Sequence, residues 1–241
     1  MRLQGRVAAV TGAGGGIGAA IVAAFRAEGA EVVESDLKAD GLGPGGLAID
    51  VSKPEDARRL VEETVARHGR IDILANVAGI SVRHAIFDVT PEDFDRVLRV
   101  NLYGSFYCLQ EAARPMVEAG YGRIVNIASI SGVRVGAERM AYGISKAGVV
   151  ALTQQAAMEL APFGITVNAI APGPVDTALT RAHHTPAARA NYHRMIPAAR
   201  YGFPEEMADA AVFLAGEAAA YVNGVVLPVD GGYLAAGVRE D

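Results

Sequence analysis

The sequence has almost no cysteine, no tryptophan, no long apolar run and no excess of basic residues. Cys108 is the only cysteine in 241 residues, so no disulfide can form within the chain and a reducing compartment is permitted. The 22 basic residues are outnumbered by 27 acidic ones, and the formal charge of −5 gives no electrostatic footprint for nucleic acid or for a membrane surface. No apolar run approaches the ~18 residues of a membrane span. We therefore expect neither nucleic acid nor a membrane as a partner.

The chain is instead rich in apolar side chains and in glycine. Hydrophobic residues make up 51% of the sequence, enough for a sizeable core, and the 28 glycines predict many tight turns. No linker, shift in composition or short repeat divides the chain, so we expect a single domain over residues 1–241. Residues 1–6 lack a signal-peptide pattern, and we expect a cytoplasmic protein.

Short apolar runs alternate with segments of helical periodicity along the whole chain. The predicted strands cover residues 6–10, 31–35, 47–51, 71–75, 123–128, 165–170 and 225–229. The predicted helices cover residues 18–29, 52–69, 90–119, about 141–160 and 204–216. This alternation is typical of βαβ units. It predicts an α/β fold of the Rossmann type, a doubly wound parallel sheet of about seven strands with helices on both faces.

Local signals give two further expectations about the helices. Ser52 is a candidate N-cap, and Glu55 three residues later completes the pattern of a capping box. Pro115 is expected to bend the helix in which it lies. Residues 178–200, in contrast, are mixed in polarity and show no strong period.

A glycine-rich loop over residues 11–18, Thr-Gly-Ala-Gly-Gly-Gly-Ile-Gly, follows the first predicted strand and opens the first helix. Glycines let the backbone turn tightly and approach a pyrophosphate, and the helix start offers free N–H groups to it. In this strand–turn–helix context the loop indicates a dinucleotide site.

An acidic residue after the second strand indicates which dinucleotide binds. Asp36 lies 18 residues after Gly18, where a carboxylate can accept hydrogen bonds from the adenosine ribose and repel a 2′-phosphate. No arginine or lysine stands in the glycine loop, although Lys38 is close to Asp36. We therefore predict NAD as the cofactor rather than NADP.

Tyr142 and Lys146 stand four residues apart near the start of a predicted helix, so they share one face of it. A free phenol titrates near pH ~10, and a neighbouring ammonium favours the phenolate. We expect Lys146 to lower the pKa of Tyr142 and to make it a candidate general acid or base. Taken alone, the spacing also fits an exposed helix pair without a function.

Taken together, these motifs resemble the short-chain dehydrogenase/reductase family over residues 5–234. Ser129 precedes Tyr142 by 13 residues, as in the family, and the turn Asn76-Val77-Ala78-Gly79 carries a valine in place of the family's second asparagine. We expect this exchange to be tolerated, because the first asparagine is the one that bonds neighbouring backbone. The resemblance implies the catalytic residues Asn101, Ser129, Tyr142 and Lys146. It implies the cofactor-binding residues Gly12, Gly14, Gly16, Ile17, Gly18, Asp36, Asp50, Val51, Asn76, Ala78, Gly79, Tyr142, Lys146, Pro172, Gly173, Val175 and Thr177.

The resemblance also implies a role for each catalytic residue. Ser129 would orient the substrate carbonyl oxygen, and Tyr142 would exchange a proton with it. Lys146 would tune the tyrosine and hold the nicotinamide ribose, while Asn101 would hold a water that relays protons. The segment after the sixth strand would orient the nicotinamide ring. The hydride chemistry itself belongs to the cofactor.

The implied function is that of an oxidoreductase that interconverts a secondary alcohol and a ketone with NAD(H), acting on a small molecule and using no metal. A catalytically idle NAD(H)-binding sensor or scaffold is the alternative of a different class. Within the enzyme reading, a 3-oxoacyl-(acyl-carrier-protein) reductase-like activity and a catabolic alcohol, sugar or hydroxysteroid dehydrogenase stay open. The spacing of four between Tyr142 and Lys146 disfavours the enoyl reductase branch, which keeps more residues between the pair. The family also implies a homotetramer and a substrate lid over residues 178–200.

Overall fold

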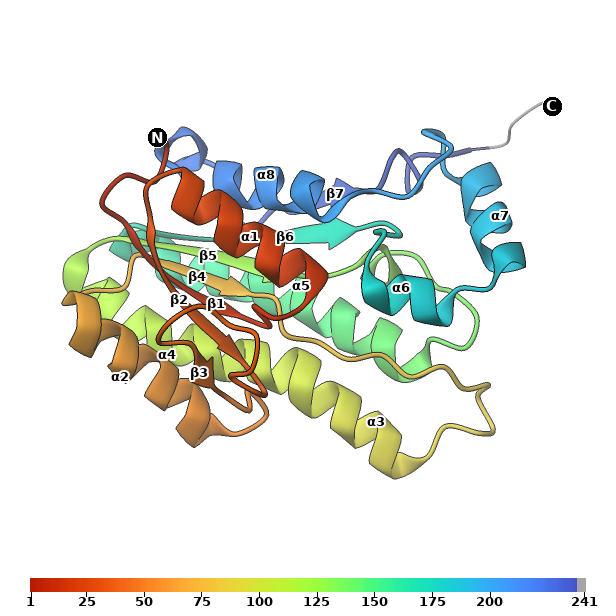
Figure 1. Cartoon of the computed structure of the whole chain (residues 1–241), viewed down its shortest axis with the longest axis horizontal. Helices are drawn as coiled ribbons and strands as arrows, with labels where there is room; N and C mark the ends of the chain where they lie inside the picture. The colour runs from red at the N-terminus through yellow and green to blue at the C-terminus, as the bar shows by residue number, and fades with distance from the viewer. Residues whose placement is uncertain (238–241) are drawn as a thin grey trace.

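A computed structural model describes residues 1–237, with the backbone alone described for Leu179, Ala182 and His183. Its centre is a parallel sheet of seven strands in the order β3-β2-β1-β4-β5-β6-β7 (Figure 1). The strands are β1 (Val7–Thr11), β2 (Glu31–Asp36), β3 (Leu47–Ala48), β4 (Ile73–Asn76), β5 (Gly122–Ile127), β6 (Ile165–Pro172) and β7 (Val226–Val229). The predicted doubly wound sheet is confirmed.

The strand order reverses between β1 and β4, which pair with each other through Ala8–Thr11 and Ile73–Asn76. The chain runs from β1 outward to β2 and β3, then returns to β4 and proceeds outward on the other side. Open α/β sheets bind ligands at such a reversal, beyond the carboxyl ends of the strands. The topology therefore locates a crevice where β1, β4 and β5 end.

Helices cover both faces of the sheet, which makes three layers. On one face, α1 (Gly16–Ala27) and α8 (Pro204–Ala215) bury Phe25 and Met207 against the central strands. The other face is covered by α2 (Pro54–His68), α4 (Gly104–Ala119) and α5 (Met140–Leu160), which bury Leu60 and Met116. All the central strands are buried on both sides, and this explains their unbroken apolar runs. The helix α3 (Pro91–Leu98) precedes α4.

The segment 178–200, for which no period was predicted, forms two short helices. They are α6 (Ala178–His183) and α7 (Pro186–Met195). Figure 1 shows both beyond one end of the sheet, the end toward which the arrowhead of β6 points. Thr177 and Thr185 cap them, because each threonine hydroxyl accepts a backbone N–H from the first turn. The pair therefore stands at the end of the sheet where a ligand crevice is expected.

Two local predictions near residue 50 are wrong. Ile49 still donates to the Asp36 carbonyl, but the next backbone N–H turns away to Asp56 Oδ2 at 2.8 Å, so β3 ends at Ala48 instead of residue 51. Ser52 does not cap α2, because its hydroxyl donates to Asp50 Oδ1 at 2.6 Å. The helix begins at Pro54, and Lys53 at the N-cap makes no side-chain cap bond.

A π-helical turn, Arg99–Tyr103, joins α3 to α4 within the segment predicted as one helix or two packed helices. Asn101 lies in this turn and is completely buried. Such turns occur often at functional sites, because the extra residue re-aims the side chains around it. Within the described part of the chain, no helix combines the length and the apolar character that crossing a membrane requires.

Candidate active site

Lys146 is buried on α5, directly beneath the carboxyl end of β5. Its side chain is 4% exposed, and its Nζ donates to the carbonyl oxygen of Ile127, the last residue of β5, at 2.7 Å. Burial penalises the ammonium and lowers the pKa of Lys146 to about 8. Its Nζ lies 5.9 Å from the centre of the Tyr142 ring, so the predicted proximity of these two residues is confirmed.

Tyr142 is half-buried one helical turn earlier, and its hydroxyl is hydrogen-bonded to Ser129. Burial raises the pKa of Tyr142 above its ordinary value, while the Ser129 hydrogen bond and the charge of Arg139 oppose that rise. The predicted lowering of this pKa is wrong for the protein without cofactor. The loss of hydration outweighs the nearby charges, and the ammonium of Lys146 is directed at Ile127.

Ser129 begins the loop after β5 and is 7% exposed. Besides its bond with Tyr142, its Oγ accepts the N–H of Ser131 at 3.1 Å. This second contact fixes the rotamer of Ser129 and leaves its oxygen facing the phenol. The structure thus brings the predicted serine and tyrosine into direct contact.

The Asn101 side chain is occupied by protein groups. Its Oδ1 accepts the N–H of Ile80 at 2.8 Å, and its Nδ2 donates to the Ile80 carbonyl and to Ser145 Oγ, both at 2.9 Å. Both amide hydrogens are therefore used. A Cβ added to Gly79 would lie 3.3 Å from Asn101 Oδ1 and 3.4 Å from Lys146 Nζ. Asn101 and Lys146 thus converge on Gly79, where a Cβ would fit tightly.

The glycine loop has the shape that a dinucleotide phosphate requires. The helix α1 begins at Gly16 without a side-chain cap and without an acidic residue in its first turn, so its first N–H groups are free to bind an anion. A Cβ on Gly16 would come within 3.0 Å of Thr177 Cγ2, and one on Gly18 would collide with the Gly12 carbonyl. The loop passes close to the segment after β6, and the residues present fit a nicotinamide dinucleotide.

Asp36, the residue predicted to bind the adenosine ribose, is bonded to this loop. Its Oδ2 accepts the N–H of Gly14 at 3.0 Å, and its Oδ1 accepts the N–H of Leu37 at 2.7 Å. The two bonds hold the carboxylate at the carboxyl end of β2, beside the glycine turn. Lys38 is exposed in the loop that follows.

Other predicted cofactor residues have structural contacts of their own. Asn76 donates to the Ser105 carbonyl at 3.2 Å and to Asn126 Oδ1 at 2.9 Å, so the first asparagine of the turn does bond its surroundings. Val77 packs against the core beside α1, which accounts for the valine there. Asp50 accepts the N–H of Ser52, and Val51 is buried.

The segment after β6 folds over the crevice. Val175 is buried, and its carbonyl accepts the Thr180 hydroxyl. A Cβ on Gly173 would come within 2.8 Å of Asp230 Cα, so this turn lies against the chain that follows β7. Thr177 Oγ1 accepts the N–H of Thr180 as the cap of α6, a role the sequence did not predict.

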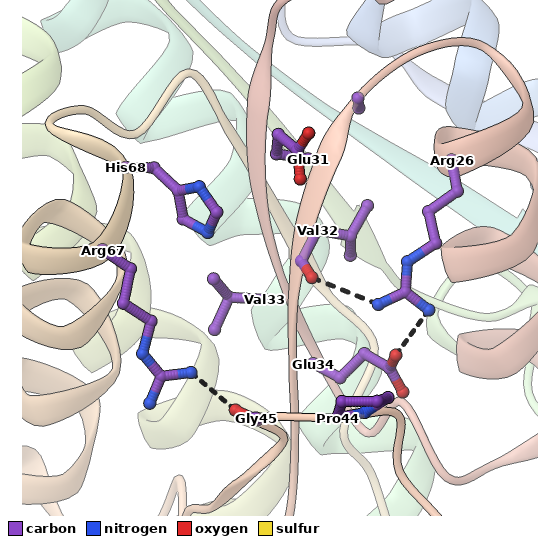
Figure 2. A pocket seen from close by; sticks show the side chains of 10 residues that line it. Arg26, Glu31, Val32, Val33, Glu34, Pro44, Gly45, Arg67 and His68 are labelled. Carbon is purple, nitrogen blue, oxygen red and sulfur yellow. Dashed lines mark hydrogen bonds and ion pairs between the residues drawn. The ribbon is translucent and has the colours of Figure 1, made fainter.

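The predicted catalytic residues do not line the cavity of about 560 Å³ shown in Figure 2. That cavity lies along the outer edge of β2, where Arg26 pairs with Glu34 at 2.6 Å and Arg67 donates to the Gly45 carbonyl at 2.6 Å. Arg26 and Arg67 are held by these contacts, and no residue of the predicted site contributes to the wall of the cavity.

Comparison with known proteins gives consistent matches over nearly the whole chain. The profile of a family described as Enoyl-(Acyl carrier protein) reductase matches residues 12–234. The NAD-dependent glycerol dehydrogenase of Listeria innocua is 39% identical, over 95% of this chain and 93% of its own. The 3-oxoacyl-(acyl-carrier-protein) reductase of Thermotoga maritima is 38% identical, over 96% of this chain and 99% of its own. A crystal structure described as an NAD(P)-dependent gluconate 5-dehydrogenase of Beutenbergia cavernae, with NADP at low occupancy, is 41% identical. It superposes with a TM-score of 0.91 over 97% of this chain and 98% of its own.

The chain belongs to the short-chain dehydrogenase/reductase family. It is an oxidoreductase that acts on alcohol and ketone groups with a nicotinamide cofactor. Membership of this family explains why the chain has both a glycine loop and the Ser129–Tyr142 contact at the end of one parallel sheet.

Sequence reasoning missed several side chains that hold this short-chain dehydrogenase/reductase site together. Thr11 Oγ1 accepts the N–H groups of Val77 and Ala78, at 3.0 and 3.2 Å, and so joins the glycine loop to the turn after β4. Asn126 and Thr153 continue the buried chain of hydrogen bonds that starts at Asn76. Buried polar residues in otherwise apolar segments are the signal that could have identified them.

Gly12→Ala is expected to destabilise the enzyme more than Gly5→Ala by about 1–3 kcal/mol, the usual penalty for overpacking. Both glycines have a positive φ, +66° and +72°, so the backbone strain is similar. A Cβ at Gly12 would lie 2.7 Å from the Ala78 N, whereas nothing lies within 4 Å of one at Gly5. Urea unfolding of the two variants measures the difference, and equal stabilities would contradict the close approach described.

Lys146→Met is expected to raise stability at pH 7, by at most about 3 kcal/mol. The folded pKa of Lys146 is lowered to about 8 from an ordinary 10.5, so between these values the unfolded chain binds the proton and the folded chain does not. The stability of the wild type therefore increases as the pH rises through this window, and the advantage of the variant shrinks. Urea unfolding at pH 7 and at pH 10 tests this, and a difference independent of pH would refute it.

Proposed function

We propose that this enzyme interconverts a secondary alcohol and a ketone with NAD(H), with Tyr142 as the general acid and base. The observation that carries the proposal is the hydrogen bond between the Ser129 and Tyr142 hydroxyls, made beside the glycine loop with Lys146 buried next to it. A substrate oxygen that enters between the two hydroxyls exchanges their mutual bond for one bond to each.

In ketone reduction, the Tyr142 hydroxyl gives its proton to the carbonyl oxygen as the carbon receives a hydride; oxidation reverses both transfers. NAD(H), when bound, supplies or accepts that hydride. Ser129 holds the same oxygen in place and stabilises the charge that develops on it. Because its pKa is raised, Tyr142 is protonated at neutral pH and stands ready as the acid of the reductive direction.

Lys146 and Asn101 support this proton exchange in the proposal. Lys146 has a pKa near 8 without cofactor, which puts its proton within reach of physiological pH. It is proposed to hold the nicotinamide ribose with the amine that now donates to Ile127. Asn101, whose side chain is bonded to Ile80 and Ser145, is proposed to position the neighbouring backbone for a relay water.

NAD is the proposed cofactor in preference to NADP. The Asp36 carboxylate, held by the N–H groups of Gly14 and Leu37, would accept ribose hydroxyls and repel a 2′-phosphate. The glycerol dehydrogenase relative is described as NAD-dependent, which supports this choice. The Beutenbergia structure, described as NAD(P)-dependent and with NADP at low occupancy, is the finding that favours NADP.

A small catabolic alcohol is the proposed substrate, and residues 178–200 are its proposed lid. The Asp36 carboxylate argues against a biosynthetic reductase, which usually draws on NADPH. The second candidate, a 3-oxoacyl-(acyl-carrier-protein) reductase activity, is favoured by the Thermotoga relative at 38% identity. The Tyr142–Lys146 spacing of four argues against enoyl reduction despite the description of the matching profile.

We further propose a cytoplasmic homotetramer. Large apolar side chains are exposed on the outer sides of α4 and α5 and on α8, and they would be covered by other subunits: Phe106, Ile144, Met158, Phe163 and Phe213. Cys108, the single cysteine, is buried and unpaired, as a reducing compartment permits. Light scattering gives the subunit number directly.

A substrate panel assayed with both cofactors tests the proposed function. Small secondary alcohols, polyols and 3-oxoacyl thioesters are each offered with NAD(H) and with NADP(H). The proposal expects the highest kcat/KM for an alcohol with NAD. Faster turnover of 3-oxoacyl thioesters would favour the second candidate, and NADH binding without any turnover would favour a sensor.

A further inference from the structure

An aromatic cluster joins residues 178–200 to Tyr201 and Tyr233. The Tyr192 ring of α7 stacks on His184, with centroids 5.4 Å apart and planes 10° apart. It meets Tyr201 edge-on at 5.9 Å and Tyr233 at 6.3 Å. Tyr192 therefore lies at the centre of the cluster and connects α7 to the segments before α8 and after β7.

Tyr201 and Arg189 hold the cluster in place. Tyr201 is 4% exposed, and its hydroxyl is 2.9 Å from His184 Nδ1. Arg189 lies 4.5 Å from the centre of the Tyr201 ring and pairs with Asp176 at 3.3 Å. Asp176 stands immediately after the β6 turn, so this contact ties α7 to the sheet. The ring of Tyr192 is thereby held on a fixed support.

The Tyr192 hydroxyl makes no hydrogen bond within the cluster. In the described part of the chain it has no hydrogen-bond partner, and the side chain is half-buried. Tyr201, in contrast, has its hydroxyl bonded to His184. A half-buried hydroxyl without a protein partner is suited to a polar group of a ligand.

The cluster reaches the loop that carries Ser129, because Arg134 of that loop lies 5.5 Å from the centre of the Tyr233 ring. Tyr192 is also close enough to the catalytic phenol for its field to add to the raised pKa of Tyr142, after the larger effect of burial. At the start of α5, Arg139 donates to Ser81 Oγ at 2.8 Å and lies 5.4 Å from the Tyr142 ring centre. The described neighbours of Tyr142 thus include the Ser129 hydroxyl and a guanidinium, which are polar groups.

We infer that Tyr192 is a specificity-determining residue, whose hydroxyl binds a second hydroxyl of a diol or polyol while Tyr142 acts on the first. This inference rests on the proposed function, because it assumes that Tyr142 acts on an alcohol. An apolar substrate would leave the Tyr192 hydroxyl unpaired, and a site with an unpaired polar group discriminates against the substrate that lacks its partner. The substrate class is accordingly a small vicinal polyol.

The test compares 2,3-butanediol with 2-butanol, which share a carbon skeleton and differ by one vicinal hydroxyl. The wild type is expected to prefer the diol in kcat/KM with NAD. Tyr192→Phe is expected to lower kcat/KM for the diol by about tenfold, the effect of one hydrogen bond, chiefly through KM. For 2-butanol the same variant is expected to change kcat/KM less than twofold.

Two further tyrosine variants separate recognition from support of the lid. Tyr221→Phe removes a hydroxyl from a fully exposed side chain remote from the cluster and is expected to change neither substrate. Tyr201→Phe removes the bond to His184 and is expected to raise KM for both substrates together, because it loosens the anchor. The effect of Tyr192→Phe must differ from the effects of both controls, because it should lower kcat/KM for the diol and not for 2-butanol.

The outcomes distinguish this inference from the proposed function. If the wild type oxidises both alcohols equally, or if Tyr192→Phe slows both by the same factor, Tyr192 does not read the second hydroxyl and the proposed function still stands. If the wild type oxidises no alcohol in the presence of NAD, the proposed function itself fails.

Discussion

Tyr142→Phe is expected to lower kcat by about 10²–10⁴-fold, the usual contribution of a positioned general acid or base. The change removes one oxygen from a half-buried ring and keeps its packing, so the fold should persist. It leaves a substrate oxygen with Ser129 as its partner but without a proton donor. Because the loss occurs in the chemical step, kcat and kcat/KM should decrease together.

NADH binding is the control for this variant. The Tyr142 hydroxyl is bonded to Ser129, whereas Asp36 is bonded to the glycine loop, so the dissociation constant for NADH, measured by fluorescence titration, should change less than about threefold. Ser129→Ala should also lower kcat, because the substrate oxygen then loses its orienting bond. Turnover by Tyr142→Phe above a tenth of the wild-type rate would contradict the assigned role. A wild type that binds NADH but turns over nothing would instead indicate a sensor.

The case of Tyr142 and Lys146 shows how far sequence spacing leads. A spacing of four residues on a helix predicted correctly that the two side chains lie on one side of α5. The direction of the tyrosine pKa could not be predicted from the spacing, because it depends on how much water the fold removes around the phenol. Burial also acts on the lysine, and it lowers one pKa as it raises the other.

The sequence predicted the strands and helices themselves better than the residues at which they begin and end. Apolar runs and helical periods predicted the seven strands and the alternating helices, because burial on both sides of a parallel sheet leaves a strong pattern. The end of β3 and the start of α2 were missed, since Asp56 and Asp50 compete there for backbone and serine donors. Such competition between side chains depends on three-dimensional placement.

Residues 178–200 illustrate the opposite limit. Their helices bury few apolar side chains against the sheet, so no period of 3.6 was visible in the sequence. They are held by aromatic ring contacts and by the Arg189–Asp176 pair, which join residues far apart in the chain. Tyr192 could not be identified from the sequence for the same reason. Its ring partners Tyr201 and Tyr233 follow β6 and β7 and are distant in the chain.

The second large expected effect is on the choice of cofactor. Asp36→Asn is expected to shift the ratio of kcat/KM for NAD over that for NADP by about 100-fold toward NADP. A carboxylate bond to a ribose hydroxyl contributes about 1.5–3 kcal/mol, or about 10–100-fold, and removal of the charge also ends the repulsion of a 2′-phosphate. Asparagine keeps an oxygen that can accept the Gly14 N–H, so the loop geometry should survive.

Asp40→Asn is the matched control, because it removes the same charge from an exposed residue of the loop that follows Asp36. It should leave the cofactor ratio within about twofold, since a solvated charge is screened over a Debye length of about 8 Å. If Asp40→Asn shifts the ratio as much as Asp36→Asn, general electrostatics decides the preference instead of a contact with the ribose. If the wild type already prefers NADP, Lys38 in the adjoining exposed loop outweighs Asp36, and Lys38→Ala should then restore the preference for NAD.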